Sequence, residues 1–331
     1  MNNTLLLSLK LLALFLLTCS LTLPIKAHAK DKITWYVTEW APYNITRGKL
    51  KRKGINDKLI NKVQYTNLYK NNKKLNCEIA IVSADAKLLD YVNSNKKFLL
   101  SHSIQNLEKF LRNRQLLTFL KHKPKILCFS KYHFTNRSFF TSIYGKEIII
   151  PSIDNDFFEV NLKNEINKNV IFYSRGDRNG SIVIDVWKKI FRKLAIKQKL
   201  YIAPDIKINS NEMLEFNIFK REYMDKKNLI NFLKKFRLLI IPGHKGEVFC
   251  NVAEEAKALC IPIVTLGIGA LNERVENNYN GFICKNLKEF EEKITTLLLD
   301  DNIYLKFKKN LIKDRGNHKW SNTVDQLIKL F

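Results

Sequence analysis

Several patterns that would assign a protein class directly are missing from this 331-residue sequence. Its six cysteines never form Cys-x-x-Cys, which argues against a zinc ribbon or a redox pair. Its 57 Lys and Arg residues form no dense block with interleaved aromatics, which argues against a nucleic-acid platform. No solenoid-type repeat is visible either, so the sequence leaves an ordinary globular fold as the main expectation.

The residues that are present predict a folded and strongly basic protein. Hydrophobic residues make up 46% and aromatic residues 11%, as in globular chains, and the length suffices for two domains. The net charge of +26 comes from lysines spread over the sequence, which most often means a solvated surface or a compositional bias. An anionic membrane is the next partner that this charge favours, and we expect no nucleic acid.

Residues 1–29 resemble a secretory signal peptide. Lys10 precedes an apolar run over 11–23, and Ala27-His28-Ala29 has the small-x-small pattern of a cleavage site. The run is short for a membrane span, although an uncleaved anchor would show the same pattern. Export conflicts with the cysteines, because free Cys inside apolar runs such as 125–130 indicates a reducing compartment.

From residue 74 onward, strands and helices alternate in an order that predicts parallel sheets covered by helices. In the first half the expected strands are 75–84, 96–104, 125–130 and 146–152, and the expected helices are 86–94 and 104–123. In the second half the expected strands are 169–174, 199–204, 237–242 and 260–265, and the expected helices are 180–195, 226–236, 250–259, 287–300 and 302–314. A polar stretch over 154–167 separates the two halves, so the sequence predicts two α/β domains in series.

One turn and helix of the second half carry Glu247 and Glu255 between two apolar runs. In doubly wound folds ligands lie at the carboxyl ends of the strands, and the first N–H groups of the helix, near 248–250, are a seat for phosphate. Along a continuous helix the two glutamates would be roughly 12 Å apart, which suits the ends of one extended ligand and is wide for a glycosidase pair. The competing interpretation is a solvated helix face, to which we assign Glu254 and Lys257.

The strand at 169–174 ends in a second loop that is suited to phosphate. Arg175 and Arg178 follow this strand and precede the helix at 180–195. Arg is the side chain best suited to bidentate phosphate binding, whereas an Arg-Gly-Asp loop is also a common surface turn. Two phosphate-suited loops in one domain are stronger evidence than either loop alone.

The motifs of residues 238–284 occur in a fixed order that one enzyme family shares. Glu247 and Glu255 have seven residues between them, and Val248 and Cys250 stand where the family has glycine. The further matched positions are Pro262, Gly267, Gly269, Glu273, Asn280 and Gly281. This order resembles the donor-binding half of glycosyltransferase family 4 (glycosyl transferases group 1), whose pattern is Glu-Gly-Phe-Gly, a second Glu, Gly-Leu-Pro-Val-Val, Gly-Gly, Pro-Glu-Ile-Val and Asn-Gly. The resemblance is good over 165–331 and fair over 74–155.

The resemblance implies a fold and an activity. The fold is α/β of the GT-B type, with two Rossmann-like domains facing across a cleft and the first of them incomplete. The activity is that of a retaining glycosyltransferase, which moves a sugar from a nucleotide-diphosphate sugar to a surface-polysaccharide or lipopolysaccharide acceptor. Glu255 would bind the ribose and Glu247, as the catalytic carboxylate, the sugar hydroxyls. The implied donor-binding residues are Arg175, Arg178, Glu247, Val248, Phe249 and Glu255. The family's chemistry is metal-independent, so we expect no metal and no other cofactor.

The first half offers fewer candidates for the site. By the same resemblance His102 would be a catalytic histidine near the donor, and the competing interpretation is an ordinary polar residue at a strand end. Arg112 and Arg114 would face either an acceptor phosphate or solvent. Residues 30–64 contain no glycine-rich acceptor loop and instead resemble the start of a periplasmic solute-binding protein, with its Trp-x-Pro-Tyr segment.

Three interpretations of the whole chain therefore stay open. The first is a glycosyltransferase in the cytoplasm or at the inner membrane, the second a periplasmic solute-binding-like protein, and the third a composite or degenerate chain without activity. The predicted segments are a signal-like segment 1–29, a solute-binding-like fragment 30–64, a partial acceptor-side domain 65–160, a donor domain 161–316 and a C-terminal helix 317–331 that packs back on the first domain.

Overall fold

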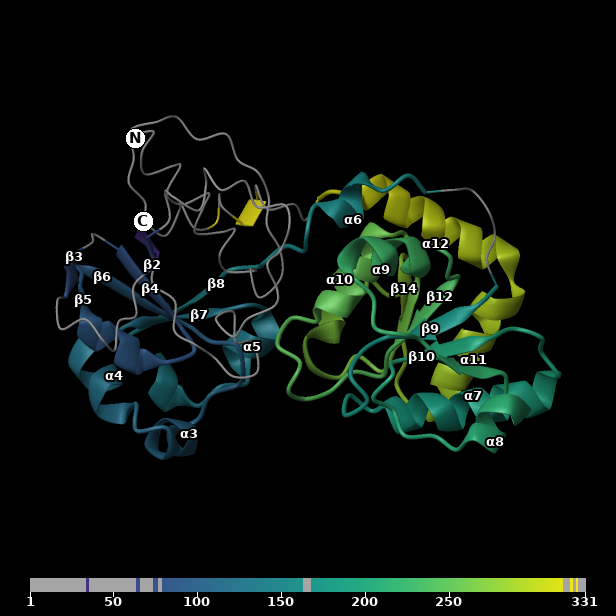
Figure 1. The fold of residues 1–331 in the computed structure, drawn as a ribbon, viewed down its shortest axis with the longest axis horizontal. Helices are drawn as coiled ribbons and strands as arrows, with labels where there is room; N and C mark the ends of the chain where they lie inside the picture. Colours follow the sequence, from purple (N-terminus) through teal and green to yellow (C-terminus); the bar gives the residue numbers. More distant parts are fainter. Residues whose placement is uncertain are drawn as a thin grey trace. The chain divides into compact units, whose positions relative to one another are not determined.

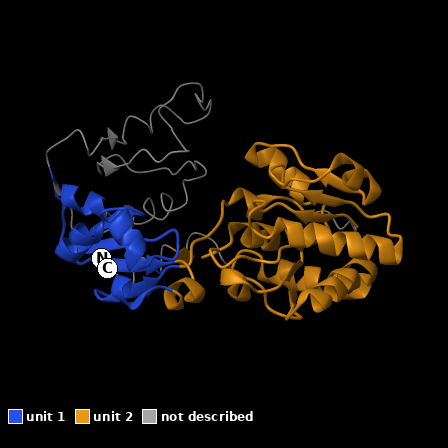
Figure 2. Ribbon diagram, turned by 90° about the horizontal axis from the view of Figure 1, so that it is seen from below, with its two compact units in different colours: residues 1–128, 137–149, 324–331 blue, residues 129–136, 150–323 orange. Residues whose placement is uncertain are grey.

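The computed structural model describes residues 34–35, 64–65, 74–76, 79–162, 168–317, 322–323 and 326. The predicted signal segment 1–29 lies outside the described residues, as do most of the solute-binding-like fragment 30–64 and most of the predicted C-terminal helix 317–331. The chain divides into two compact units, coloured separately in Figure 2. Unit 1 contains residues 1–128, 137–149 and 324–331, and unit 2 contains residues 129–136 and 150–323.

Unit 1 has a sheet of four parallel strands in the order β4-β6-β7-β8. The strands of this sheet are β4 (Ile79–Ser83), β6 (Lys96–Leu100), β7 (Lys125–Cys128) and β8 (Lys146–Ile148). Two short parallel pairs accompany it, β1 (Thr34–Trp35) with β2 (Gln64–Tyr65) and β3 (Leu75–Asn76) with β5 (Val92–Asn93). The helical segments are η1 (Ala86–Tyr91), α3 (Leu107–Arg112), α4 (Leu116–His122) and η2 (Phe139–Ser142). The four predicted strands of the first half are present.

The helix expected over 104–123 is two helices instead of one. Arg114 adopts the left-handed conformation at φ 53°, which ends the right-handed helix and starts a new direction for α4. The apolar spacing remains continuous across this break because both helices face the same core, where the rings of Phe110 and Phe119 lie 4.9 Å apart. Hydrophobic periodicity alone therefore could not reveal the break.

Unit 2 has a sheet of six parallel strands with helices on both faces, α7 on one face and α9 and α10 on the other (Figure 1). Its strands are β9 (Val170–Phe172), β10 (Leu200–Ile202), β11 (Ile218–Lys220), β12 (Leu238–Ile240), β13 (Ile263–Thr265) and β14 (Gly281–Ile283). Its helical segments are α5 (Lys131–Thr135), α6 (Asp156–Glu159), α7 (Gly180–Leu194), α8 (Ser210–Glu215), α9 (Lys226–Leu233), α10 (Asn251–Ala258), η3 (Gly269–Glu273), α11 (Leu287–Leu299) and α12 (Asp301–Asp314). The four strands and five helices predicted for the second half are present, whereas β11, β14 and the short helices α5, α6 and α8 were not predicted.

The strand order of unit 2 is β11-β10-β9-β12-β13-β14. Numbered along the unit, this is the order 3-2-1-4-5-6 of a dinucleotide-binding doubly wound sheet. The direction of winding reverses between β9 and β12, which pair directly with Leu238 opposite Val170. The loops that follow β9 and β12 therefore leave the same edge of the sheet side by side, at the point where such folds bind ligands.

The boundary between the units differs from the predicted one at residue 160. Unit 2 begins at Ile150, and Ile153 and Phe157 are buried in its core at 3% and 4% exposure. The segment 129–136 also belongs to unit 2, although it directly follows strand β7 of unit 1. The polar composition after 154 suggested a linker, but these two apolar side chains anchor the segment in unit 2.

Candidate functional site

The loops after β9 and β12 bring three predicted or neighbouring polar residues into contact. The guanidinium Nη1 of Arg178 lies 2.7 Å from Nδ1 of His244, and its Nε lies 3.9 Å from Oε2 of Glu247. Nδ1 of His244 also accepts from the N–H of Gly246 at 3.0 Å, so the ring proton is on Nε2. The side chain of Asn179 donates to the carbonyl of Gly243 at 2.6 Å. The structure thus places Glu247 beside a cation on the neighbouring loop.

Two glycines allow the Glu247 loop to pack directly against another backbone segment. Gly243 has φ 97°, and a Cβ there would lie 2.4 Å from the carbonyl oxygen of Ile268. Gly269 has φ 78°, and its Cβ would lie 2.3 Å from the carbonyl oxygen of His244. Side chains are excluded at both positions by these approaches and by the left-handed backbone. The N–H of Ala270 donates to the carbonyl of Glu247 at 2.9 Å, which completes the link between the two loops.

The turn after Glu247 has a left-handed residue at one of the two positions where the family pattern has glycine. Cys250 has φ 72°, a left-handed conformation that is unusual for a non-glycine residue and costs on the order of 1 kcal/mol. The side chains of Val248 and Phe249 are buried, and the assignment of these residues to a donor stays a prediction. Within the described part of the chain, no hydrogen-bond acceptor pairs with the N–H groups of residues 248–250. These N–H groups precede the eight-residue helix α10 and remain available to an anion.

Glu255 lies in α10 in a different polar environment. Its carboxyl group is next to Tyr173, which follows β9, and near Arg221, which follows β11. Burial raises the pKa of Glu255 to about 7, although the hydrogen bond with Tyr173 and the charge of Arg221 act in the opposite direction. The hydroxyl of Tyr173 donates to the carbonyl of Val252 at 2.8 Å, which fixes its ring against the helix. The two glutamates therefore have separate surroundings on the same sheet edge.

Two further predicted residues have other immediate neighbours. Arg175 is largely exposed and pairs with Asp177 at 2.9 Å, so Arg178 and not Arg175 is the arginine next to Glu247. His102 belongs to unit 1, where its Nε2 lies 2.7 Å from the hydroxyl of Ser83 and partial burial lowers its pKa.

Arg112 is the last residue of α3, and Arg114 follows shortly after it. The contacts of these two side chains do not indicate a binding site. Arg112 forms an exposed ion pair with Glu108 at 3.7 Å, and Arg114 occupies the break between the helices α3 and α4. Such an exposed pair contributes little to stability. Whether these side chains face an acceptor phosphate or solvent stays a prediction.

Glu254 is not part of a solvated helix face, as the sequence suggested. Its side chain is 5% exposed and forms ion pairs with Lys257 at 3.1 Å and with Arg274 at 3.4 Å. Arg274 is also buried, so the two charges compensate each other away from water. The sequence could not show that Glu254 is buried in an ion pair, because its partner Arg274 is twenty positions away along the chain.

Three residues of the site were not identified from the sequence. Tyr173 and Arg221 each follow a strand directly, and His244 lies within the stretch that carries Glu247. The rule that ligands lie at the carboxyl ends of strands would have selected Tyr173 and His244. Arg221 could not be selected, because β11 was not predicted.

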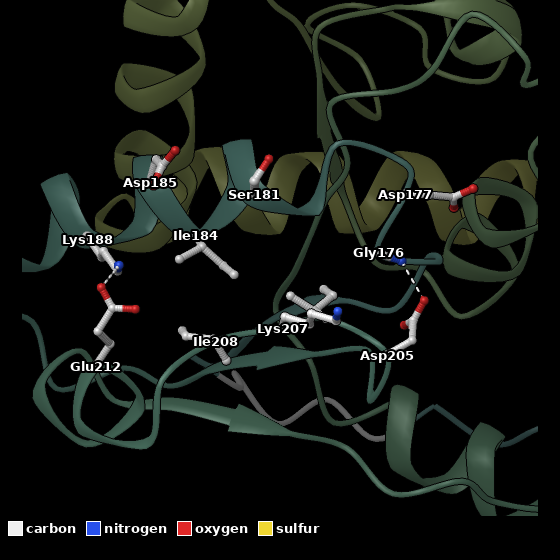
Figure 3. Close-up of a pocket in the computed structure, with 11 residues that line it drawn as sticks. Gly176, Asp177, Ser181, Ile184, Asp185, Lys188, Asp205, Lys207, Ile208 and Glu212 are labelled. Carbon is white, nitrogen blue, oxygen red and sulfur yellow. Dashed lines mark hydrogen bonds and ion pairs between the residues drawn. The ribbon is translucent and has the colours of Figure 1, made fainter.

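A groove of about 510 Å³ lies between α7 and the segment that joins β10 to α8 (Figure 3). Its polar lining includes Asp177, Asp185, Asp205 and Glu212 together with Lys188 and Lys207. Lys188 is paired with Glu212, and Asp205 accepts from the N–H of Gly176 at 2.8 Å. Neither Glu247, Glu255 nor Arg178 lines this groove, and its carboxylates disfavour a phosphate ligand. The groove is therefore separate from the candidate site.

The described ranges contain neither a metal-binding cluster nor a membrane-spanning helix. The described residues contain no group of three or more His, Cys, Asp and Glu side chains that could hold a metal ion. None of the helices that the structure describes is both long and apolar enough to cross a membrane. The four described cysteines, Cys128, Cys250, Cys260 and Cys284, are free and buried.

Comparison with known proteins gives matches over the same region of the chain. Residues 154–314 match the family model described as glycosyl transferases group 1. An uncharacterized glycosyltransferase of Methanocaldococcus jannaschii is 26% identical over 236 residues, which cover 64% of each chain. The matched stretch thus spans less than two thirds of this curated relative.

Two solved structures show the same fold. The chain is similar to TarM of Staphylococcus aureus, in a complex that contains UDP, with a TM-score of 0.58 and 15% identity over 72% of this chain and 51% of that one. It is also similar to WaaG, described as a glycosyltransferase involved in lipopolysaccharide biosynthesis, with a TM-score of 0.57 and 12% identity over 72% and 77% of the two chains. The predicted α/β fold of the GT-B type is confirmed.

Proposed function

We propose that this protein is a retaining glycosyltransferase that uses a nucleotide-diphosphate sugar, because residues 154–314 match the family model of glycosyl transferases group 1. The observation that carries the proposal is the arrangement at the switch point of the unit 2 sheet. Arg178, His244 and Glu247 are in contact on the loops after β9 and β12, and Glu255 of α10 lies beside Tyr173, which follows β9. Two separate polar groups on one sheet edge suit the two ends of an extended donor.

The donor binds with its nucleoside at Glu255 and its sugar at Glu247. The carboxylate of Glu255 accepts hydrogen bonds from the ribose hydroxyls, and Glu247 accepts from the hydroxyls of the transferred sugar. The diphosphate lies between them, beside the guanidinium of Arg178 and the free N–H groups of residues 248–250. Arg178 replaces Arg175 in this role because Arg175 faces solvent and Asp177.

The chemical step releases a nucleoside diphosphate, and negative charge grows on the leaving phosphate as the glycosidic bond breaks. A guanidinium and N–H dipoles that are already in place stabilise this charge without reorganising at the moment of reaction. The Oε2 atom of Glu247 lies 3.9 Å from Nε of Arg178, and we assign this carboxylate to positioning the sugar and to stabilising positive charge on it. The metal-independent chemistry expected from the family needs only these groups.

We propose a glycan or glycolipid of a bacterial surface as the acceptor, with catalysis on the cytoplasmic side of the membrane, where nucleotide sugars are made. The similarity to WaaG, a glycosyltransferase involved in lipopolysaccharide biosynthesis, and to TarM in its complex supports this choice of substrate class. Unit 1 supports it by apolar side chains that face solvent next to basic ones. Leu117 of α4 is 81% exposed and Phe139 of η2 is 86% exposed, and the segment 107–123 carries five Lys and Arg residues against one Glu. Such a surface suits an anionic membrane.

A transfer assay tests the proposal. The purified full chain is incubated with UDP- and GDP-sugars and a lipid-linked glycan acceptor, and release of the nucleoside diphosphate is followed. The anomeric configuration of the product, read by NMR, must equal that of the donor if the enzyme is retaining. Glu247→Gln is expected to lower kcat by about 100-fold or more. A product of inverted configuration would refute the retaining mechanism, and no nucleotide release from any donor would refute the enzyme.

A further inference from the structure

Arg274 occupies a position between the two halves of the candidate site. It ends the short helix η3 and is 4% exposed. The centre of its guanidinium lies 4.9 Å from the centroid of the Phe249 ring, close enough for a cation–π contact. Its Nη1 lies 3.4 Å from Oε1 of Glu254 and its Nη2 lies 3.8 Å from Oε2 of Glu273. One buried side chain thus contacts three separate segments of unit 2.

Two of these segments carry the donor-site glutamates. Phe249 follows Glu247 by two residues in the same turn, and Glu254 immediately precedes Glu255 in α10. A shift of the guanidinium would therefore move both glutamates, because the ring of Phe249 and the carboxylate of Glu254 are each held by it.

Glu273, the third contact of Arg274, is linked through α5 to the turn that carries Glu247. Glu273 accepts from the N–H groups of Lys131 and Tyr132, at the start of α5, at 2.8 Å and 2.5 Å. From α5 the hydroxyl of Tyr132 donates to the carbonyl of Lys245 at 2.8 Å. The hydroxyl of Ser130 donates to the carbonyl of Val248 at 2.7 Å. The loop that carries Glu247 is therefore enclosed by α5, η3 and Arg274.

The buried charges of Arg274 and Glu254 explain why the arrangement depends on this pair of residues. The carboxylate of Glu254 is buried, and removal of Arg274 would take away one of the cations that pair with it. Breaking a buried pair in this way forces the surrounding segments to move or the carboxylate to take up a proton. Either response changes the position or the field of the adjacent Glu255.

We propose that Arg274 is a positioning residue of the donor site, which sets the turn of Glu247 through Phe249 and the helix of Glu255 through Glu254. The inference rests on the proposed function, because it assigns these two glutamates to one nucleotide-sugar ligand. Arg274 itself contacts neither ligand nor reacting atoms and acts only through these neighbours.

The test measures nucleotide affinity against stability. UDP and GDP are titrated into the full-length wild-type chain and into Arg274→Met by calorimetry, and thermal unfolding is recorded for both. We expect Arg274→Met to bind the preferred nucleotide about tenfold more weakly. In Arg274→Met/Glu254→Met, where an apolar pair replaces the ion pair, most of the affinity returns, because neither charge of this buried pair is left without the other.

Arg237 provides a matched control in the same unit. Its side chain is fully buried, its guanidinium lies 4.1 Å from the Tyr304 ring centroid, and its Nε donates to the carbonyl of Leu297. Arg237→Met should lower the unfolding temperature and leave the nucleotide affinity of the folded protein unchanged.

Each result separates the inference from the function on which it rests. A wild-type chain that binds neither nucleotide overturns the proposed function. If the wild-type chain binds a nucleotide and Arg274→Met binds it equally well, only the positioning role is overturned. If Arg274→Met does not fold, Arg274→Lys replaces it, because Lys keeps the charge opposite Glu254 and cannot contact Glu273 and the Phe249 ring together. We then expect an affinity reduced by about threefold or more, and wild-type affinity in Arg274→Lys would overturn the role.

Discussion

At the scale of single residues, the two glutamates of the site lie in different environments. Glu247 lies in a turn beside the guanidinium of Arg178, whereas Glu255 lies in α10 beside Tyr173. Burial raises the pKa of Glu255 to about 7, so this carboxyl group changes its charge near neutral pH. The sequence identified both glutamates by their spacing and by the family pattern. It could not show the neighbours that set their charge, because Tyr173 is 82 positions from Glu255.

The raised pKa of Glu255 predicts pH-dependent nucleotide binding. A carboxylate accepts hydrogen bonds from both ribose hydroxyls, so affinity for UDP or GDP should rise by about tenfold between pH 6 and pH 8. In Glu255→Gln the affinity should be low and nearly independent of pH. Calorimetric titration at the two pH values measures this, and an equal pH dependence in the Gln variant would show that another group is responsible.

The carboxyl group of Glu255 also affects stability. Its contribution to stability changes with pH in the opposite direction to its contribution to nucleotide affinity. The folded pKa is raised above its ordinary value of 4.5, so the folded state holds a proton between pH 4.5 and about 7 that the unfolded state has lost. The contribution of Glu255 to the free energy of unfolding is therefore full below pH 4.5 and decreases as the pH rises toward 7.

At the scale of elements, the site depends on two loops that lie next to each other because β9 pairs with β12. Alternation of apolar runs and helices predicted both strands, and the rule on carboxyl ends predicted that their loops meet. The order of the six strands was not predictable, because two of the three residues of β11 are exposed and β14 begins with a glycine, so neither forms an apolar run. The role of α5 was also hidden, since a five-residue helix leaves no periodic pattern.

The close approach at Gly269 predicts a severe effect of one added methyl group. In Gly269→Ala the Cβ would meet the carbonyl oxygen of His244 at 2.3 Å on a backbone with φ 78°, so the loop of Glu247 must move. We expect the free energy of unfolding to fall by more than about 2 kcal/mol and nucleotide binding to be lost.

Gly145→Ala is the matched control for this substitution. Gly145 also has a positive φ, of 100°, but its Cβ would meet only the flexible side chain of Lys125, at 3.3 Å. The control should be milder in chemical denaturation and should keep its nucleotide affinity. Equal behaviour of the two variants would contradict the account of the loop contact.

At the scale of the whole molecule, the chain combines a unit 2 that matches a known family model with a unit 1 whose first segments lie outside the described residues. The GT-B class was predicted correctly because the motifs of unit 2 occur in a fixed order along the chain. The boundary was placed too late, at 160, because a polar composition was given more weight than Ile153 and Phe157, which are buried in unit 2. The conflict between the signal-like segment and a nucleotide-sugar donor remains a prediction about residues 1–29.

The apolar and basic surface of unit 1 predicts binding to anionic lipid. The full chain should co-sediment with vesicles of phosphatidylcholine and phosphatidylglycerol, and much less with phosphatidylcholine alone, with a strong dependence on salt. Leu117→Ser/Phe139→Ser should reduce binding to the anionic vesicles by about fivefold or more.

The control for the lipid experiment is Leu214→Ser, because Leu214 is 84% exposed but lies in α8 of unit 2. It should bind vesicles like the wild type. Equal loss of binding in this control, or none in the double variant, would exclude the proposed lipid surface.

Calorimetric titration of the purified full-length chain with UDP and GDP tests the central claim most directly. We predict that one of the two nucleotides binds with a dissociation constant below about 1 mM, the upper end of the usual enzyme range, and that Glu255→Ala abolishes this binding while the variant remains folded. No binding of either nucleotide at millimolar concentration, or equal binding by folded Glu255→Ala, would contradict the assignment of a nucleotide-sugar site to this edge of the sheet.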